Sequence, residues 1–152
     1  MNVQINKIDN FKGDYAFLSN FYNAPVTYDG IAYSNNEAAF QAQKCPDPAG
    51  RIRYTQIKNP VIAKRLGRHE TLPTDWESTC FDVMSAILHQ KFANPELAKL
   101  LLDTGDAYLE EGNHWHDNRW GHCTCDKCRD KEGQNWLGKI LMGIRDELRA
   151  RP

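Results

Sequence analysis

The sequence has no long hydrophobic run, and no stretch approaches the roughly 18 apolar residues that a membrane-spanning helix needs. Its start holds no apolar segment of the kind that a secretory signal peptide carries. An excess of charge is also missing, since 19 Lys and Arg stand against 20 Asp and Glu. Overall charge therefore does not hold this chain to nucleic acid or a membrane, although a local basic patch can.

The sequence also lacks an even number of cysteines, so its five cysteines cannot all be paired. Three of the five crowd into Cys123, Cys125 and Cys128. This distribution argues against a secreted disulfide framework and favours a reducing, cytoplasmic location. There is no repeat and no linker, and 152 residues is a length typical of one domain of roughly 100–200 residues. We therefore expect one globular domain over residues 1–152.

Hydrophobic periodicity predicts short strands first and helices afterwards. The run 25–33 alternates around Asp29-Gly30, a strong hairpin signal. Ser34 to Glu37 resembles a capping box that opens a helix through Lys44. Asn59-Pro60 opens another helix, with Gly67 as its expected C-cap.

The second half of the chain is mainly helical in pattern. Thr74 to Glu77 forms another capping box, followed by an amphipathic helix whose apolar face comprises Trp76, Cys80, Val83, Met84, Ile87, Leu88 and Phe92. A helix from Asn94-Pro95 should end at Thr104-Gly105, and the chain is then polar and irregular to Gln134. The last helix carries Leu137, Ile140, Leu141, Ile144 and Leu148 on one face. We predict a helix-dominant α+β domain.

The segment 36–44 is the first candidate site. On a helix, Glu37, Phe40 or Gln41, and Lys44 share one face, so that a carboxylate, an aromatic or amide group, and an amine point into the same space. The alternative is structural: Glu37 completes the capping box, and Lys44 is solvated and complements the helix C-terminus.

A second candidate is the segment 51–69, which contains no acidic residue. Its cations are Arg51, Arg53, Lys58, Lys64, Arg65 and Arg68. In a chain of nearly zero net charge, such segregation indicates a phosphate or pyrophosphate partner, and a solvated basic face is the alternative.

The third candidate is the polar segment 110–121. It holds Trp115 and Trp120 beside Asp117, and indole walls with a carboxylate suit a site that stacks a base and polarises a glycosidic bond. The alternative is a loop packed by its own Trp side chains.

The three clustered cysteines allow two interpretations. Their thiolates can share a zinc ion, with His116, His122 or the distant Cys45 as the fourth ligand. The C-x-C-x2-C spacing lacks a second cysteine pair, so a reduced loop with free thiols is the alternative. No metal ligand or cofactor is assigned from the sequence.

Five segments in order resemble the NADAR, or YbiA-like, family. They are Ser19-Asn20-Phe21, residues 37–44, Thr104-Gly105-Asp106, Asp117 with Trp120-Gly121, and residues 133–142. The resemblance runs from about Phe11 to Leu148. It implies a YbiA-like fold and an N-glycosidase that cleaves the bond between ribose C1′ and an exocyclic amine.

The resemblance also implies substrates and residues. One family branch removes ADP-ribose from guanine in DNA and so reverses a toxin ADP-ribosyltransferase, which would make that toxin a functional partner. Another branch acts on phosphoribosylamino-pyrimidine intermediates of riboflavin synthesis. The implied catalytic residues are Glu37, Lys44 and Asp117. The implied substrate-binding residues are Ser19, Asn20, Phe21, Phe40, Gln41, Arg51, Trp76, Trp115, Trp120 and Asn135.

Several alternatives stay open. Lys44 either attacks C1′ and holds the opened sugar as a Schiff base, or binds a phosphate or hydroxyl group. We favour DNA as substrate because segment 51–69 offers more positive charge than one phosphate needs. A non-catalytic module that binds ADP-ribose and a zinc-knuckle adaptor for nucleic acid are the other functions considered.

Overall fold

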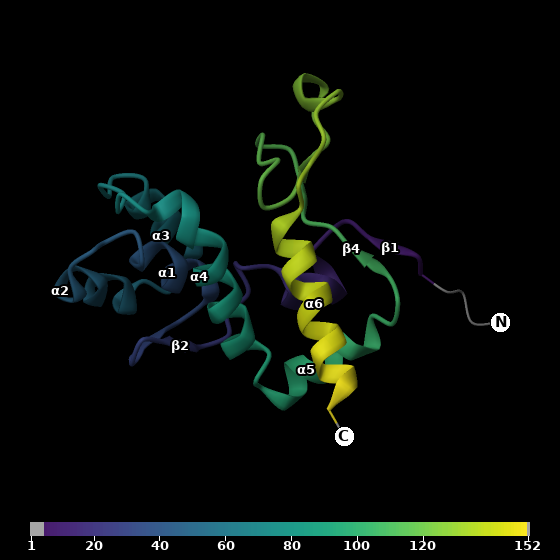
Figure 1. Ribbon diagram of the computed structural model, residues 1–152, viewed down its shortest axis with the longest axis horizontal. Coiled ribbons are helices and arrows are strands. Elements are labelled where there is room, and N and C mark those ends of the chain that lie inside the picture. The colour runs from purple at the N-terminus through teal and green to yellow at the C-terminus, as the bar shows by residue number, and fades with distance from the viewer. Residues whose placement is uncertain (1–4, 152) are drawn as a thin grey trace. The chain divides into compact units, whose positions relative to one another are not determined.

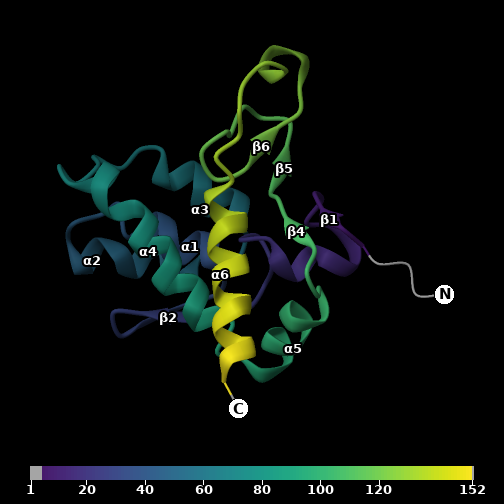
Figure 2. The same ribbon diagram turned by 45° about the vertical axis from the view of Figure 1, so that its right-hand side comes forward.

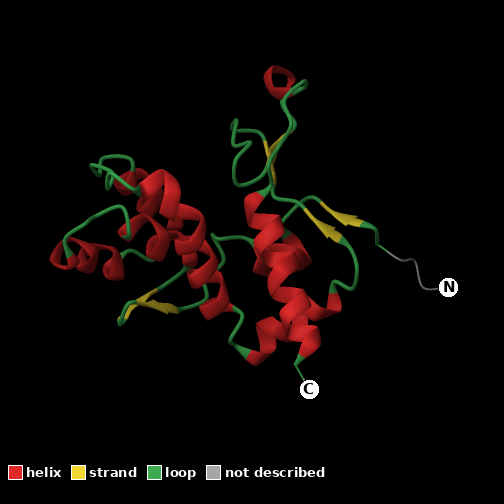
Figure 3. Ribbon diagram, in the orientation of Figure 1, coloured by secondary structure: helices red, strands yellow, loops and turns green. Residues whose placement is uncertain are grey.

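The computed structural model describes residues 5–151, which form two compact units. One unit is the continuous segment Asn20–Asn94, and the other combines residues 5–19 with residues 95–151. Helices dominate and the strands are short, which confirms the predicted helix-dominant α+β class (Figure 3). None of the helices within residues 5–151 is both long and apolar enough to cross a membrane.

The segment Asn20–Asn94 begins with a hairpin and continues as helices (Figure 1). Its elements in order are β2 (Val26–Tyr28), β3 (Ile31–Tyr33), α1 (Asn36–Ala42), α2 (Pro48–Arg51), the 3-10 helix η2 (Ile52–Gln56), α3 (Pro60–Gly67) and α4 (Trp76–Lys91). Helix α1 packs against α3, α4 and η2, and all of its residues are buried. The helix with the first candidate residues is therefore the centre of this unit.

The predicted hairpin is confirmed. Strands β2 and β3 are antiparallel, with Val26 opposite Tyr33. Asp29 and Gly30 have φ angles of 51° and 79°, the left-handed pair that a type I′ turn requires.

Three details of the helix ends differ from the prediction. Helix α1 is capped by Asn35 instead of Ser34, because the Asn35 side chain accepts the Ala38 N–H over 2.9 Å. The helix ends at Ala42, and hydrogen-bonded turns carry the chain on through Lys44. Helix α4 begins after Asp75 instead of Thr74, without a side-chain cap.

Helix α3 shows a fourth difference. Asn59 caps it and Pro60 is its first residue, as predicted. Gly67 is the last helical residue, however, and the C-cap is Arg68. Gly67 therefore has a role other than helix termination.

The second unit contains α5 (Pro95–Asp103) and α6 (Trp136–Ala150) (Figure 2). Strand β1 (Lys7–Ile8) pairs in parallel with β4 (Tyr108–Leu109), and β5 (Gly112–Asn113) pairs in parallel with β6 (His122–Cys123). Two 3-10 helices, η1 (Gly13–Leu18) and η3 (Asp126–Cys128), complete it.

The expectation that strands come first is wrong in part, because β4, β5 and β6 follow α5. Each of these strands has only two residues, so the sequence contains no alternation of apolar and polar side chains that would predict them.

The predicted apolar helix faces are largely confirmed. In α4 and just beyond it, the buried residues include Trp76, Cys80, Met84, Ile87, Leu88 and Phe92, while Val83 is half-buried. In α6, the buried apolar residues include Leu137, Ile140, Leu141 and Ile144, while Leu148 is half-buried. These faces form the cores of the two units.

Candidate functional site

Glu37 and Gln41 form a buried polar pair on α1. The side-chain amide of Gln41 donates to Oε1 of Glu37 over 2.8 Å, and the two residues are 4% and 6% exposed. Because Asn35 caps the helix, Glu37 does not fill the capping-box position that the sequence offered as its structural role. A carboxylate is costly to bury, so a buried carboxylate such as Glu37 is typical of a functional site.

Gly67 of α3 makes room for this pair. A Cβ at this position would overlap Oε1 of Gln41. The glycine therefore allows α3 to approach α1 closely enough to enclose the Gln41 amide, a role that its place at a helix end concealed.

Lys44 follows one turn after Gln41 and is half-buried. Burial lowers the pKa of its amine, although the negative charge of Glu37 acts in the opposite direction. The positive charges of Lys64 and Arg68 lower the pKa further. A lysine that loses its proton more readily is a better nucleophile, and three cations close together suit a phosphate group.

Phe40 and Trp76 pack in the core of the same unit. Their ring centroids lie 5.3 Å apart at an interplanar angle of 48°, and both residues are 6% exposed. The structure thus divides the face that the sequence assigned jointly to Phe40 and Gln41: the amide joins Glu37, and the ring packs against the indole.

Arg51 and Trp76 line one pocket of about 370 Å³, together with Gln43. The Arg51 guanidinium donates through Nε to the Cys45 carbonyl over 2.9 Å, and its Nη1 lies 3.6 Å from Oδ2 of Asp29. These contacts hold the guanidinium in place at the pocket wall.

The segment 51–69 is not a uniform basic surface. Arg53 donates to Oε1 of Glu70 over 2.8 Å, and the Tyr54 hydroxyl donates to the same oxygen over 2.9 Å. The sequence concealed this pairing, because Glu70 lies just beyond the segment. The cations Lys64 and Arg65 lie on α3, and Arg68 directly follows it.

Within the predicted Ser19-Asn20-Phe21 motif, Asn20 supports the start of α1. The Asn20 side chain accepts from Asn36 over 3.2 Å, and its backbone carbonyl accepts the Glu37 N–H over 3.2 Å. Phe21 is 40% exposed, and Lys64 Nζ lies 5.9 Å from its ring centroid. Ser19 belongs to the other unit, where its N–H donates to the Ala16 carbonyl.

Asp117 is held in a hydrogen-bonded turn of the other unit. Its Oδ1 accepts the N–H groups of Arg119 and Trp120 over 3.1 and 2.9 Å. Asn113 supports the turn from beneath: its Oδ1 accepts the Asp117 N–H, and its Nδ2 donates to the Asp117 carbonyl over 2.8 Å. The half-buried carboxylate is therefore preorganised by the backbone around it.

The other predicted site residues of this unit are Trp115, Trp120 and Asn135, and they differ in exposure. Trp115 is 53% exposed, whereas Trp120 is half-buried and meets Trp136 edge-on with centroids 5.4 Å apart. Asn135 is buried, and its amide donates to the Leu109 carbonyl over 2.8 Å while accepting the Glu111 N–H. Asn135 thus joins β4 to the start of α6.

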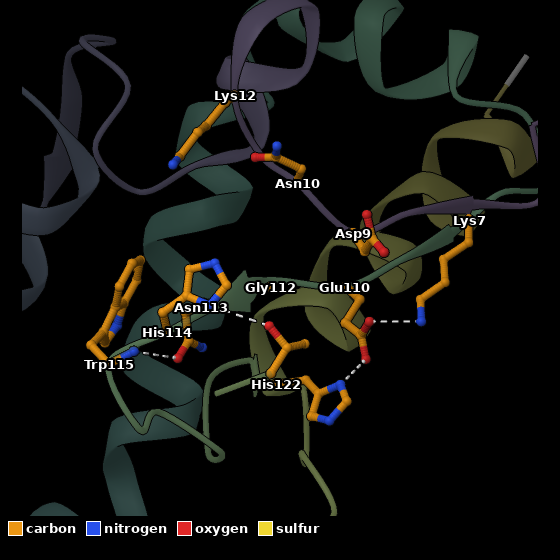
Figure 4. A pocket seen from close by; sticks show the side chains of 11 residues that line it. Lys7, Asp9, Asn10, Lys12, Glu110, Gly112, Asn113, His114, Trp115 and His122 are labelled. Atoms are coloured by element: carbon orange, nitrogen blue, oxygen red, sulfur yellow. Dashed lines mark hydrogen bonds and ion pairs between the residues drawn. The ribbon is translucent and has the colours of Figure 1, made fainter. Parts of the chain in front are cut away.

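A second pocket, of about 300 Å³, lies in this unit (Figure 4). It is lined by a group of interacting ionisable side chains that the sequence did not reveal. The buried Glu110 contacts Lys7 Nζ at 2.9 Å and Nδ1 of His122 at 3.0 Å. Its hydrogen bond to Lys7 raises the pKa of that amine. Among the described residues that line this pocket, only Trp115 was predicted as a site residue. Lys7 and Glu110 meet through the β1–β4 pairing, which has no sequence signature.

Lys91 is a further titratable residue that sequence reasoning missed. It is 1% exposed, and burial lowers its pKa from 10.5 to about 7. Its amine lies 5.5 Å from the Tyr22 ring centroid and 5.3 Å from that of Phe92. Its position, four residues after Ile87 and three after Leu88, places it on the apolar face of α4, a signal that the charge of the side chain concealed.

The predicted site residues thus fall into two groups. Glu37, Gln41 and Lys44 come together within the unit Asn20–Asn94. Asp117 and Trp120 come together within the other unit.

Comparison with known proteins identifies the family of this chain. The model of the NADAR domain matches residues 9–149. N-glycosidase YbiA of Escherichia coli (strain K12) is 37% identical over 138 residues, which cover 89% of this chain and 82% of that protein. The NMR structure of the E. coli protein YbiA aligns with a TM-score of 0.81 and 35% identity, over 97% of this chain and 88% of that one.

This chain is also similar to a protein whose name refers to riboflavin biosynthesis. Riboflavin biosynthesis protein VVA0006 of Vibrio vulnificus is 34% identical over 142 residues, which cover 89% of this chain and 36% of that longer protein. The matched domain covers nearly all of the sequence, so this chain belongs to the NADAR family.

Proposed function

We propose that this chain is an N-glycosidase that hydrolyses the bond between ribose C1′ and an exocyclic amine of a planar heterocycle. The observation that carries the proposal is the buried Glu37–Gln41 pair one turn before Lys44, whose pKa burial lowers. The names of the N-glycosidase relatives support it.

Each group has a role in this reaction. The Glu37 carboxylate stabilises the positive charge that develops at C1′, and the Gln41 amide orients it. The neutral Lys44 amine attacks C1′, the C1′–N bond breaks, and its electron pair leaves with the heterocyclic amine, which takes up a proton. Opening of the sugar ring gives a protonated Schiff base on Lys44. Water adds to this imine, and the lysine leaves, so the net reaction consumes one water.

The cations beside Lys44 favour a phosphorylated sugar. Lys64 and Arg68 both act on its amine, and charge-assisted hydrogen bonds to phosphate are strong. The first candidate substrate is ADP-ribosylated guanine in DNA, since a pyrophosphate and a DNA backbone both use cations, and α3 adds the exposed Arg65. A cognate ADP-ribosyltransferase would then be the functional partner.

A phosphoribosylamino-pyrimidine is the second candidate. Two relatives carry riboflavin biosynthesis in their names, from Vibrio vulnificus and Zea mays. In addition, Arg53 is ion-paired with Glu70 and Arg51 lies beside Asp29, which leaves less positive charge for DNA than the sequence implied. This candidate needs one phosphate site only.

The test incubates the wild type and Glu37→Gln with each substrate separately. Release of ADP-ribose from the modified oligonucleotide by the wild type alone supports the DNA candidate, and that activity should fall steeply with salt. Release of ribose phosphate from the pyrimidine, with little salt dependence, supports the second candidate. Binding of ADP-ribose without turnover of either substrate would overturn the N-glycosidase proposal in favour of a binding module.

A further inference from the structure

Four ligand-type side chains converge between β5, β6 and η3, outside the α1 site. They are His116, Cys123, Cys125 and Cys128, and one ligand atom from each lies within 4.8 Å of the others. His116 Nδ1 is 3.3 Å from Sγ of Cys125 and 3.4 Å from Sγ of Cys128. The fold therefore brings one imidazole nitrogen and three sulfurs close together.

These separations fit a tetrahedral metal site. Zinc bound at about 2.3 Å to sulfur and about 2.0–2.1 Å to nitrogen places neighbouring ligand atoms roughly 3.5–3.8 Å apart. Three cysteines with one histidine form a common structural zinc set, and soft thiolates select against magnesium and calcium. Only small adjustments would bring the four side chains onto one ion.

The backbone holds these ligands independently of any ion. Cys123 lies on β6 opposite Asn113 of β5, and its N–H donates to Oδ1 of Asn118 over 2.9 Å. Cys125 precedes η3, and the Cys128 N–H returns to the Cys125 carbonyl over 3.1 Å. Cys123 and Cys128 are buried, so their thiols face the interior of the loop.

His116 shows the clearest sign of a constrained ligand. Its φ is 69°, a left-handed conformation that is uncommon for residues other than glycine, and its own N–H points to Sγ of Cys123 over 3.3 Å. Of the alternatives that the sequence left open for the fourth ligand, His122 directs its Nδ1 to Glu110 instead.

We propose that His116, Cys123, Cys125 and Cys128 bind one Zn²⁺ in a structural Cys3His site. The ion ties the segment before Asp117 to the segment after β6, so it stabilises the turn that carries Asp117 and Trp120. This inference does not depend on the proposed glycosidase function.

The first experiment measures metal in protein purified under reducing conditions without chelator. We expect one zinc per chain by mass spectrometry of the elements. Reconstitution of metal-free protein with Co²⁺ should then produce a thiolate-to-cobalt charge-transfer band and the visible bands of tetrahedral cobalt. Neither assay requires a substrate, so the result is independent of the glycosidase test.

Matched variants identify the ligands. Cys125→Ser and His116→Ala should each lose zinc and the tetrahedral cobalt spectrum, with circular dichroism checking the helices. Cys45→Ser removes a buried thiol outside the cluster and should retain both. The proposal is overturned if the reduced wild type contains no zinc and gives no cobalt–thiolate band. It is equally overturned if Cys45→Ser loses the metal while Cys125→Ser and His116→Ala keep it.

Discussion

Gln41 Nε2 lies 2.8 Å from Oε1 of Glu37, and the backbone of Gly67 faces the other atom of the same amide. One side of the amide therefore orients a buried carboxylate, while the other is enclosed by a residue with no side chain. This relationship connects the packing of α3 on α1 to the position of the candidate catalytic carboxylate.

Gly67→Ala should disturb that connection. The added Cβ would displace Gln41, so we expect a loss of about 1–3 kcal/mol in the free energy of unfolding, together with a fall in turnover. The control is Gly143→Ala in α6, where a Cβ meets nothing within 4 Å. There the substitution should raise stability by about 0.5–1 kcal/mol and leave turnover unchanged. Urea unfolding and a kcat measurement on both variants decide; equal effects at the two positions would refute the packing argument.

Lys44 should form a covalent adduct during turnover. Burial lowers the pKa of its amine, which favours the neutral form that can attack C1′. Borohydride added with substrate should reduce the imine, and peptide mass spectrometry should locate the sugar on Lys44. Lys44→Arg keeps the positive charge but should give no adduct and no turnover. An active Lys44→Arg enzyme would assign Lys44 to phosphate or hydroxyl binding instead.

Asp117 allows structure and charge to be separated. Asp117→Asn keeps an oxygen that can accept the Arg119 and Trp120 N–H groups, whereas Asp117→Ala removes it. We expect Asp117→Ala to lose about 1–3 kcal/mol of stability and Asp117→Asn to lose much less. If the charge acts in the reaction, both variants lose turnover, by about 10²-fold or more. Full activity in Asp117→Asn would limit this residue to shaping the turn.

Lys91 should make stability depend on pH. Its pKa is about 7 in the folded chain and 10.5 when solvated, so between these values the unfolded chain holds a proton that the folded chain lacks. The free energy of unfolding therefore rises with pH across that interval, by about 1.4 kcal/mol per unit, and this contribution is constant below pH 7.

Lys91→Met removes the titrating group while filling similar space. The variant should exceed the wild type in stability at pH 7, and this advantage should shrink by about 2–3 kcal/mol between pH 7 and pH 9. Denaturant unfolding of both proteins at the two pH values tests this. An advantage that does not change with pH would mean that Lys91 is charged in the folded protein across the interval.

Local signals in the sequence were sufficient for much of the fold. The Asp29-Gly30 pair predicts the hairpin because it tolerates positive φ at both positions, and Asn59-Pro60 predicts the start of α3 because both residues satisfy a helix end. The apolar spacing of α4 and α6 likewise predicts their buried faces. The five ordered motifs are enough to identify the NADAR family.

Long-range packing accounts for what the sequence did not disclose. Asn35, which caps α1 by accepting the Ala38 N–H, also donates to the Lys58 carbonyl over 3.1 Å, so this cap is held by a distant part of the chain. The ionisable side chains around Glu110 come together through β1 and β4. These strands have only two residues each, which is too short for a pattern of alternating apolar and polar residues. Of the two histidines considered beside the cysteines, His116 lies with them, whereas His122 contacts Glu110. In each case the contact that decides the outcome is made only in the packed chain, so local sequence signals do not predict it.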